Sequence, residues 1–95
     1  MRIYTDEIIN AICFNAADRR GIRPNEVEVQ MSYDEEYGIT AEMWIAGRSQ
    51  YLIETNLLEA IEQYAFTHYN RRVFRSDISL GIDEEAEQFW AEFPD

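Results

Sequence analysis

Apolar residues recur at helical spacing in two stretches of the chain. The first stripe consists of Ile8, Ile9, Ile12, Cys13 and Ala16. The second stripe consists of Leu57, Leu58, Ile61, Tyr64, Ala65 and His68. Residues with this spacing share one face of a helix, so the pattern predicts amphipathic helices over residues 5–20 and 55–70. Thr5 is the expected N-cap of the first helix, and Thr55 or Asn56 is the expected N-cap of the second.

Alternation of polar and apolar residues predicts strands between and after the helices. It is strictest in residues 26–33. Further strands are predicted at residues 39–46, 49–53 and 77–82. Gly47 and Arg48 fit the first two central positions of a type II′ turn, so the strands on either side of them should form a hairpin.

The last segment, residues 88–93, fits two structures. Phe89 and Phe93, with an alanine midway between them, alternate as in a strand, but the segment also fits a helix capped by Asp83. A likeness between the two parts of the chain favours the strand, because residues 39–43 match residues 89–93 position by position. This likeness indicates an αββ pseudo-repeat, which arises either from duplication or from the pattern that any two amphipathic αββ units share.

The predicted order of elements is α-β-β-β-α-β-β. Each helix has one apolar stripe and each strand has one apolar face, so the simplest packing is an antiparallel sheet with both helices on one face. The chain has 95 residues, which is the size of one domain. The sequence therefore predicts a single α+β domain over residues 1–95.

The charge is strongly negative. The chain has 19 Asp and Glu residues against 8 cationic residues, all of them arginine, and its formal net charge is -11. Neutralisation of phosphates by Lys and Arg supplies most of the non-specific affinity for nucleic acid, so this balance argues against a nucleic-acid partner. The same reasoning argues against binding to an anionic membrane surface.

The sequence also suggests where the protein resides. No apolar run approaches the ~18 residues of a membrane span, and residues 1–8 lack the apolar segment of a signal peptide. Cys13 is the only cysteine, which is typical of a reducing compartment. We therefore expect a cytoplasmic protein.

Two runs of residues carry a resemblance to a known family. They are YGITAEMWIAGR (Tyr37–Arg48) and QYLIETNLLEAI (Gln50–Ile61), together with the turn Asp34-Glu35-Glu36 and the terminal hairpin. With these features the chain resembles the YxcD-like family, which comprises short acidic proteins of unknown function from spore-forming Gram-positive bacteria. The resemblance covers nearly the whole chain and implies no active site.

One pair of residues offers a catalytic alternative. Cys13 and His68 would be in contact if the helices pack side by side. A thiol beside a histidine base is the smallest arrangement that can act as a catalytic nucleophile. However, Cys13 lies within an apolar stripe, where a thiol usually acts as an inert small hydrophobe. His68 lies at a helix end, where a backbone carbonyl can satisfy it and its cation is favoured. A small enzyme built on Cys13 and His68 is therefore the second hypothesis.

The charged runs have structural explanations. Consecutive carboxylates in residues 34–36 and 83–85 point in different directions, so they favour solvated turns over a metal site. The arginine pairs at residues 19–20 and 71–72 follow helix ends, where cations offset the helix dipole. We predict no metal and no cofactor. A third hypothesis, an acidic mimic of nucleic acid, rests on the net charge alone.

Aromatic residues give the strongest functional signal. With Gly47 and Arg48 in the turn, Trp44 lies opposite Tyr51, and Met43 lies opposite Leu52 on the other face of the sheet. Met43 belongs to the apolar face that the helices cover. Trp44 and Tyr51 are therefore expected to point away from the helices.

Three further residues extend this candidate surface. Ile53 lies beside Tyr51 in the predicted strand, the repeat places Trp90 on the outward face, and Phe14 lies almost opposite the stripe of its own helix. Two tryptophans, a tyrosine and an isoleucine on one face of a small sheet would form an apolar patch large enough for an interaction surface. Cross-strand aromatic pairs also stabilise sheets without a partner. We expect a protein-interaction module without catalytic activity that forms a homodimer or binds another protein through this face or a sheet edge.

Overall fold

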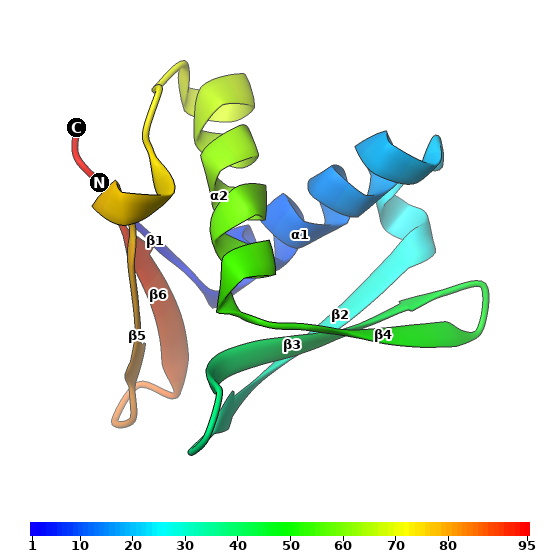
Figure 1. Ribbon diagram of the computed structural model, residues 1–95, viewed down its shortest axis with the longest axis horizontal. Helices are drawn as coiled ribbons and strands as arrows, with labels where there is room; N and C mark the ends of the chain where they lie inside the picture. The colour runs from blue at the N-terminus through cyan, green and yellow to red at the C-terminus, as the bar shows by residue number, and fades with distance from the viewer.

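The computed structural model describes residues 1–95 and contains helices and antiparallel strands (Figure 1). The helices are α1 (Thr5–Arg20) and α2 (Glu54–Tyr69), with two short 3-10 helices, η1 (Pro24–Glu26) and η2 (Arg75–Asp77). The strands are β1 (Arg2–Tyr4), β2 (Val27–Asp34), β3 (Gly38–Ile45), β4 (Arg48–Leu52), β5 (Ser79–Asp83) and β6 (Gln88–Glu92). The α+β class predicted from the sequence is confirmed, and the last segment is a strand.

The strands form two three-stranded sheets where the sequence predicted one. We call β2-β3-β4 sheet I and β1-β6-β5 sheet II, each in its spatial order. The prediction also missed β1, because three residues are too few for alternation to show. β1 pairs with β6, which lies near the other end of the chain. This long-range pairing completes sheet II and joins the two ends of the described chain.

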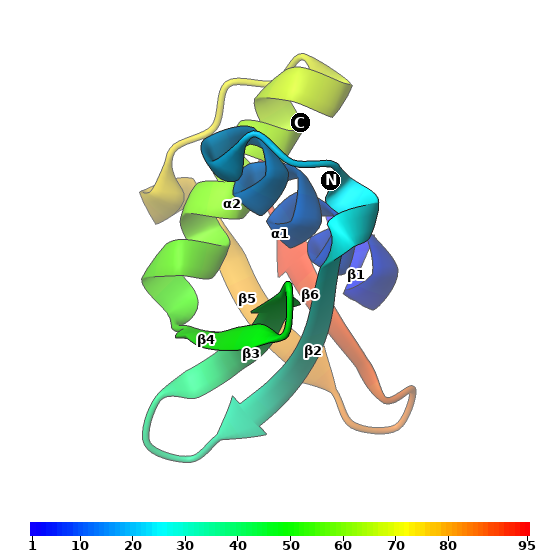
Figure 2. The same cartoon turned by 90° about the vertical axis from the view of Figure 1, so that its right-hand side faces the viewer.

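The helices cover the inner faces of both sheets. In Figure 1, α1 lies over sheet I and α2 stands between the two sheets. Figure 2 shows that the β2–β3 and β5–β6 turns both point to the end of the molecule away from the helices. The largest fully buried side chains are Ile3, Ile8, Ile12, Leu57 and Ile61. Neither helix is long and apolar enough to cross a membrane.

The two halves of the chain have the same order of elements. Residues 2–45 run strand, helix, 3-10 helix, strand, strand, and residues 48–92 follow the same order. The first strand of each half joins the sheet of the other half, because β1 pairs with β6 and β4 pairs with β3. A common origin of the two halves stays a prediction. The exchanged strands tie the halves together.

The predicted N-caps are wrong, because the N-cap positions are held by Tyr4 and Ile53 and the polar side chains that were expected there bind elsewhere. α1 begins at Thr5, and the Thr5 hydroxyl accepts a hydrogen bond from the backbone N–H of Phe89 at 2.8 Å, so it ties the helix to β6. α2 begins at Glu54, and the Asn56 side chain accepts a hydrogen bond from the N–H of Ile53 at 2.9 Å.

Candidate functional site

The face of sheet I turned away from the helices carries polar and aromatic side chains. We call it the outer face; it consists of Glu28, Gln30, Ser32, Thr40, Glu42, Trp44, Ser49 and Tyr51. Burial alternates along β3, where Ala41 and Met43 are buried and the residues beside them are partly exposed. The Ser32 and Thr40 hydroxyls lie 3.2 Å apart across the strands, as expected for side chains on one face.

The hairpin that positions Trp44 and Tyr51 differs from the predicted one. Its two turn residues are Ala46 and Gly47, with φ values of 52° and 78°, as a type I′ turn requires. Trp44 therefore pairs with Ser49, and the predicted pairing with Tyr51 is wrong by two residues. Because side chains alternate with a period of two, a shift of two residues leaves every side chain on its predicted face.

Each aromatic ring of the outer face lies beside a glutamate. Trp44 pairs directly with Glu28 of β2, and Tyr51 pairs directly with Glu42 of β3. Trp44 and Tyr51 are diagonal neighbours, and residues in this relation lie roughly 7–8 Å apart, within reach of aromatic side chains. Tyr51 is 72% exposed. The outer face thus interleaves two carboxylates with two aromatic rings.

A hollow of about 540 Å³ opens beside Trp44. Its lining consists of Glu26, Glu28, Val29, Gln30, Trp44, Ala46 and Gly47. Two carboxylates and an indole ring line it, and no arginine does. No arginine of the chain forms an ion pair with Glu28 or Glu42 either. The hollow therefore presents negative charge next to an aromatic surface.

Trp90 lies in sheet II and is separate from Trp44 and Tyr51. Its ring covers Gly81, where an added Cβ would lie 2.1 Å from the ring. The guanidinium carbon of Arg2 lies 4.2 Å from the centroid of the Trp90 ring, and an Arg2 nitrogen lies 2.9 Å from a carboxylate oxygen of Glu92. The pKa of Glu92 is lowered, chiefly by this hydrogen bond. Trp90 is thus already in contact with a cation of its own chain.

The other two residues predicted to belong to the contact surface, Ile53 and Phe14, lie outside the strands. Ile53 follows β4 as the N-cap of α2 and is 50% exposed. Phe14 is 42% exposed on α1, and its ring contacts α2, with its centroid 4.6 Å from that of His68. Ile53 adjoins sheet I, whereas Phe14 belongs to the contact between the helices.

Cys13 and His68 have different partners. The Cys13 thiol donates a hydrogen bond to the carbonyl oxygen of Val27 at 3.6 Å, and desolvation raises the pKa of this thiol. His68 is exposed and stacks on Tyr64, with ring centroids 4.3 Å apart. No hydrogen bond joins Cys13 to His68, and a thiol with a raised pKa is a poor nucleophile at neutral pH.

A carboxylate–phenol cluster joins the helices next to His68. Glu7 of α1 accepts hydrogen bonds from the hydroxyls of Tyr64 and Tyr69 of α2. The hydrogen bond to Glu7, followed by desolvation, raises the pKa of Tyr69 to about 12. Desolvation chiefly raises the pKa of Tyr64, and the charge of Glu7 adds to it. Both phenols are therefore held in their neutral form.

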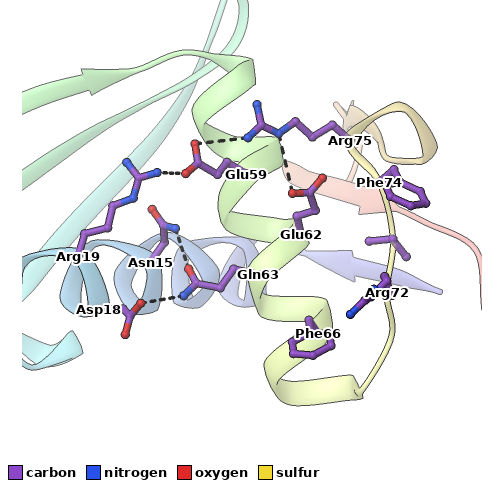
Figure 3. A pocket seen from close by; sticks show the side chains of 11 residues that line it. Asn15, Asp18, Arg19, Glu59, Glu62, Gln63, Phe66, Arg72, Phe74 and Arg75 are labelled. Atoms are coloured by element: carbon purple, nitrogen blue, oxygen red, sulfur yellow. Dashed lines mark hydrogen bonds and ion pairs between the residues drawn. The ribbon is translucent and has the colours of Figure 1, made fainter.

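A second hollow, of about 590 Å³, lies between α1, α2 and the segment that follows α2 (Figure 3). Its lining consists of Asn15, Asp18, Arg19, Glu59, Glu62, Gln63, Phe66, Arg72, Val73, Phe74 and Arg75. The three arginines are matched by three carboxylates. Phe66 and Phe74 are 54% and 65% exposed at its rim.

Most polar side chains in this hollow bind one another. Glu59 forms ion pairs with Arg19 and with Arg75, the latter at 3.7 Å (Figure 3). Gln63 accepts a hydrogen bond from Asn15 at 2.7 Å and donates one to Asp18 at 3.2 Å. The network joins α1, α2 and η2, so its groups are already engaged in holding the fold.

Sequence reasoning selected the aromatic residues of the outer face but missed its glutamates. Glu28 and Glu42 occupy the same alternating positions as Trp44, so the strand pattern could have placed them on one face. They were not selected because the chain has 19 acidic residues, so two glutamates on a strand do not stand out from the composition. His, Cys, Asp and Glu side chains form no group of three suited to a metal ion.

The fold and this face define a small α+β domain with an acidic, aromatic sheet surface. The chain belongs to the family described as Protein of unknown function (DUF2653), whose sequence profile matches residues 1–85. Comparisons with curated proteins and with solved structures gave no match.

Proposed function

We propose that this chain is a protein-interaction module and that the outer face of sheet I is its contact surface. The observation that supports this most is Tyr51, which is 72% exposed although it lies within a regular strand and diagonal to Trp44. Burying a large aromatic side chain contributes about 1.5–3 kcal/mol. Contact with a partner would gain this free energy, which the isolated chain forgoes.

The charge of the face favours a different protein over a second copy as the partner. Two copies joined through their outer faces would place Glu28 and Glu42 of each copy against those of the other. Like charges brought together at an interface are unfavourable. A partner of opposite charge gains from the same glutamates.

Site-specific photo-crosslinking tests the proposal. A photo-reactive phenylalanine replaces Tyr51 in one variant and Tyr37, which is 61% exposed in the β2–β3 turn, in the control. Both variants are irradiated in the native cells, and the adducts are identified by mass. We expect a discrete protein adduct at position 51 and none at position 37. Equal labelling at both positions, or no adduct at position 51, would contradict the proposal.

The mass of the adduct also distinguishes the two kinds of partner. An adduct at twice the mass of the chain identifies a homodimer, and any other mass identifies a different protein. We further propose that the closer relatives within the family are the YxcD-like proteins of spore-forming bacteria, as residues 37–61 suggest.

A further inference from the structure

The two sheets have equivalent positions that can be compared within the molecule. In sheet II, the central residue Ala91 pairs with Ile3 on one side and Leu80 on the other. In sheet I, Ala41 pairs with Leu52 and Met31 in the same way. Both alanines are fully buried. The central strands β6 and β3 therefore correspond through Ala91 and Ala41.

The residue after each central alanine is a glutamate. Glu92 of sheet II is opposite Arg2, whereas Glu42 of sheet I is opposite Tyr51. Glu92 is satisfied within the chain by its 2.9 Å ion pair with Arg2. Glu42 occupies the equivalent position and has no cation, because Tyr51 occupies the place of the arginine.

The arginine in sheet II also contacts an aromatic ring. Trp90 precedes Glu92 by two residues on the same face, and Arg2 lies over its ring. In sheet I, Trp44 follows Glu42 by two residues on the same face, and Glu28 lies directly beside it. Sheet I thus has the carboxylate and the ring but lacks the guanidinium that joins them in sheet II.

We propose that the outer face binds an arginine-bearing segment of a partner protein, whose guanidinium pairs with Glu42 or Glu28 and stacks on Trp44 or Tyr51. This inference rests on the proposed interaction function. A planar guanidinium binds a carboxylate through two hydrogen bonds while its face lies on an aromatic ring, which an ammonium group cannot do. The net charge of -11 attracts a basic segment over a longer range.

The two tryptophans allow a test with an internal control. A blocked peptide of six residues, alternating arginine and serine, is added to the isotope-labelled full chain, and the indole N–H signals are followed by NMR. We expect a saturable shift of the Trp44 signal and of the Tyr51 amide, with Trp90 unchanged because Arg2 already covers it. A lysine–serine peptide should bind several-fold more weakly.

Matched variants separate this site from general attraction between opposite charges. Glu28→Gln with Glu42→Gln removes two charges from the outer face, and Glu35→Gln with Glu36→Gln removes two from the exposed β2–β3 turn. We expect the first pair to weaken binding of the arginine peptide by about tenfold or more, and the second pair by less than about threefold. Circular dichroism confirms that both variants are folded.

Three results would overturn this inference alone. They are equal weakening by the two pairs of variants, equal movement of both indole signals, and a partner crosslinked at position 51 through a segment without arginine. The last result leaves the interaction function standing, because a partner has still been found at the outer face. The absence of any adduct at position 51 overturns the interaction function itself, and the inference with it.

Discussion

Individual side chains between the helices and the sheets hold this fold together. Ile61 is completely buried on α2, whereas Ile53 is 50% exposed just before the same helix. Truncation of a buried isoleucine loses its transfer free energy and leaves a cavity, so Ile61→Ala should lower the free energy of unfolding by about 2–5 kcal/mol. Ile53→Ala should lower it by less than about 1 kcal/mol. Urea unfolding measures both, and equal losses would show that Ile61 is not a core residue.

The Glu7–Tyr69 hydrogen bond should make stability depend on alkaline pH. The folded pKa of Tyr69 is about 12, above its ordinary value of 10.0. A raised folded pKa contributes stability that is fully present below pH 10 and is lost as the pH rises through about 12. Tyr69→Phe should therefore flatten the loss of stability over this interval, as measured by urea unfolding. An unchanged slope would mean that Tyr69 ionises as it does in the unfolded chain.

For individual residues, the sequence predicts which side chains are buried better than it predicts their hydrogen-bond partners. It placed Ile12, Ile61 and Met43 on buried faces, because periodicity alone determines which face of an element is apolar. It did not predict the role of Thr5, whose hydroxyl binds Phe89, or that of Glu7. Both contacts join segments that are distant in the sequence, and local patterns contain no information on such pairs.

Among the strands, Gly81 of β5 is the residue on which the Trp90 ring of β6 packs. A Cβ at residue 81 would lie 2.1 Å from that ring, so Gly81→Ala must displace Trp90 and the Arg2 side chain that covers it. We expect a loss of about 1–3 kcal/mol and a shift of the Trp90 indole signal in NMR spectra. Ser79→Ala, two residues earlier in β5, should change neither. An unperturbed Trp90 in Gly81→Ala would contradict the close contact.

The elements illustrate what alternation can and cannot determine. It identified five of the strands and placed Trp44 and Tyr51 on the same face of their hairpin. It misplaced the hairpin turn by one residue, and therefore the cross-strand pairing by two, because Ala46 adopts a positive φ, which is uncommon for a residue other than glycine. Since a shift of two preserves the faces, Trp44 and Tyr51 still share one face of sheet I, whereas Trp90 lies in sheet II and Phe14 lies between the helices.

Across the whole molecule, the net charge of -11 opposes the compact state. Increasing the salt concentration from about 0.01 M to about 0.1 M shortens the screening length from about 30 Å to about 10 Å. This screening should weaken repulsion among the carboxylates more than it weakens the few surface ion pairs, which contribute little. We therefore expect the Tm to rise by about 4 °C or more, as measured by calorimetry. A lower Tm in salt would show that the ion pairs dominate.

The division into two sheets is a property of the whole molecule that the sequence did not reveal. It depends on β1 pairing with β6, across almost the full length of the chain, and on β4 pairing with β3. The likeness between the two halves was visible and the β3–β4 hairpin was predicted, but β1 and its pairing with β6 were not. The comparison of Glu42 with Glu92 became available only once the sheet registers were known.

The most direct test of the outer face is a double variant that replaces both aromatic rings with carboxylates. Trp44→Glu with Tyr51→Glu alters the face. Tyr33→Glu with Tyr37→Glu is the control; Tyr33 lies near the end of β2 and is 58% exposed, and Tyr37 lies in the β2–β3 turn and is 61% exposed. Each tagged chain is expressed in its native cells, its fold is checked by circular dichroism, and the recovered partner is quantified by mass spectrometry. We predict a folded outer-face variant that loses the partner about tenfold or more, with the control unaffected. A folded outer-face variant that retains its partner would contradict the account, and an unfolded one would show that these two residues belong to the core.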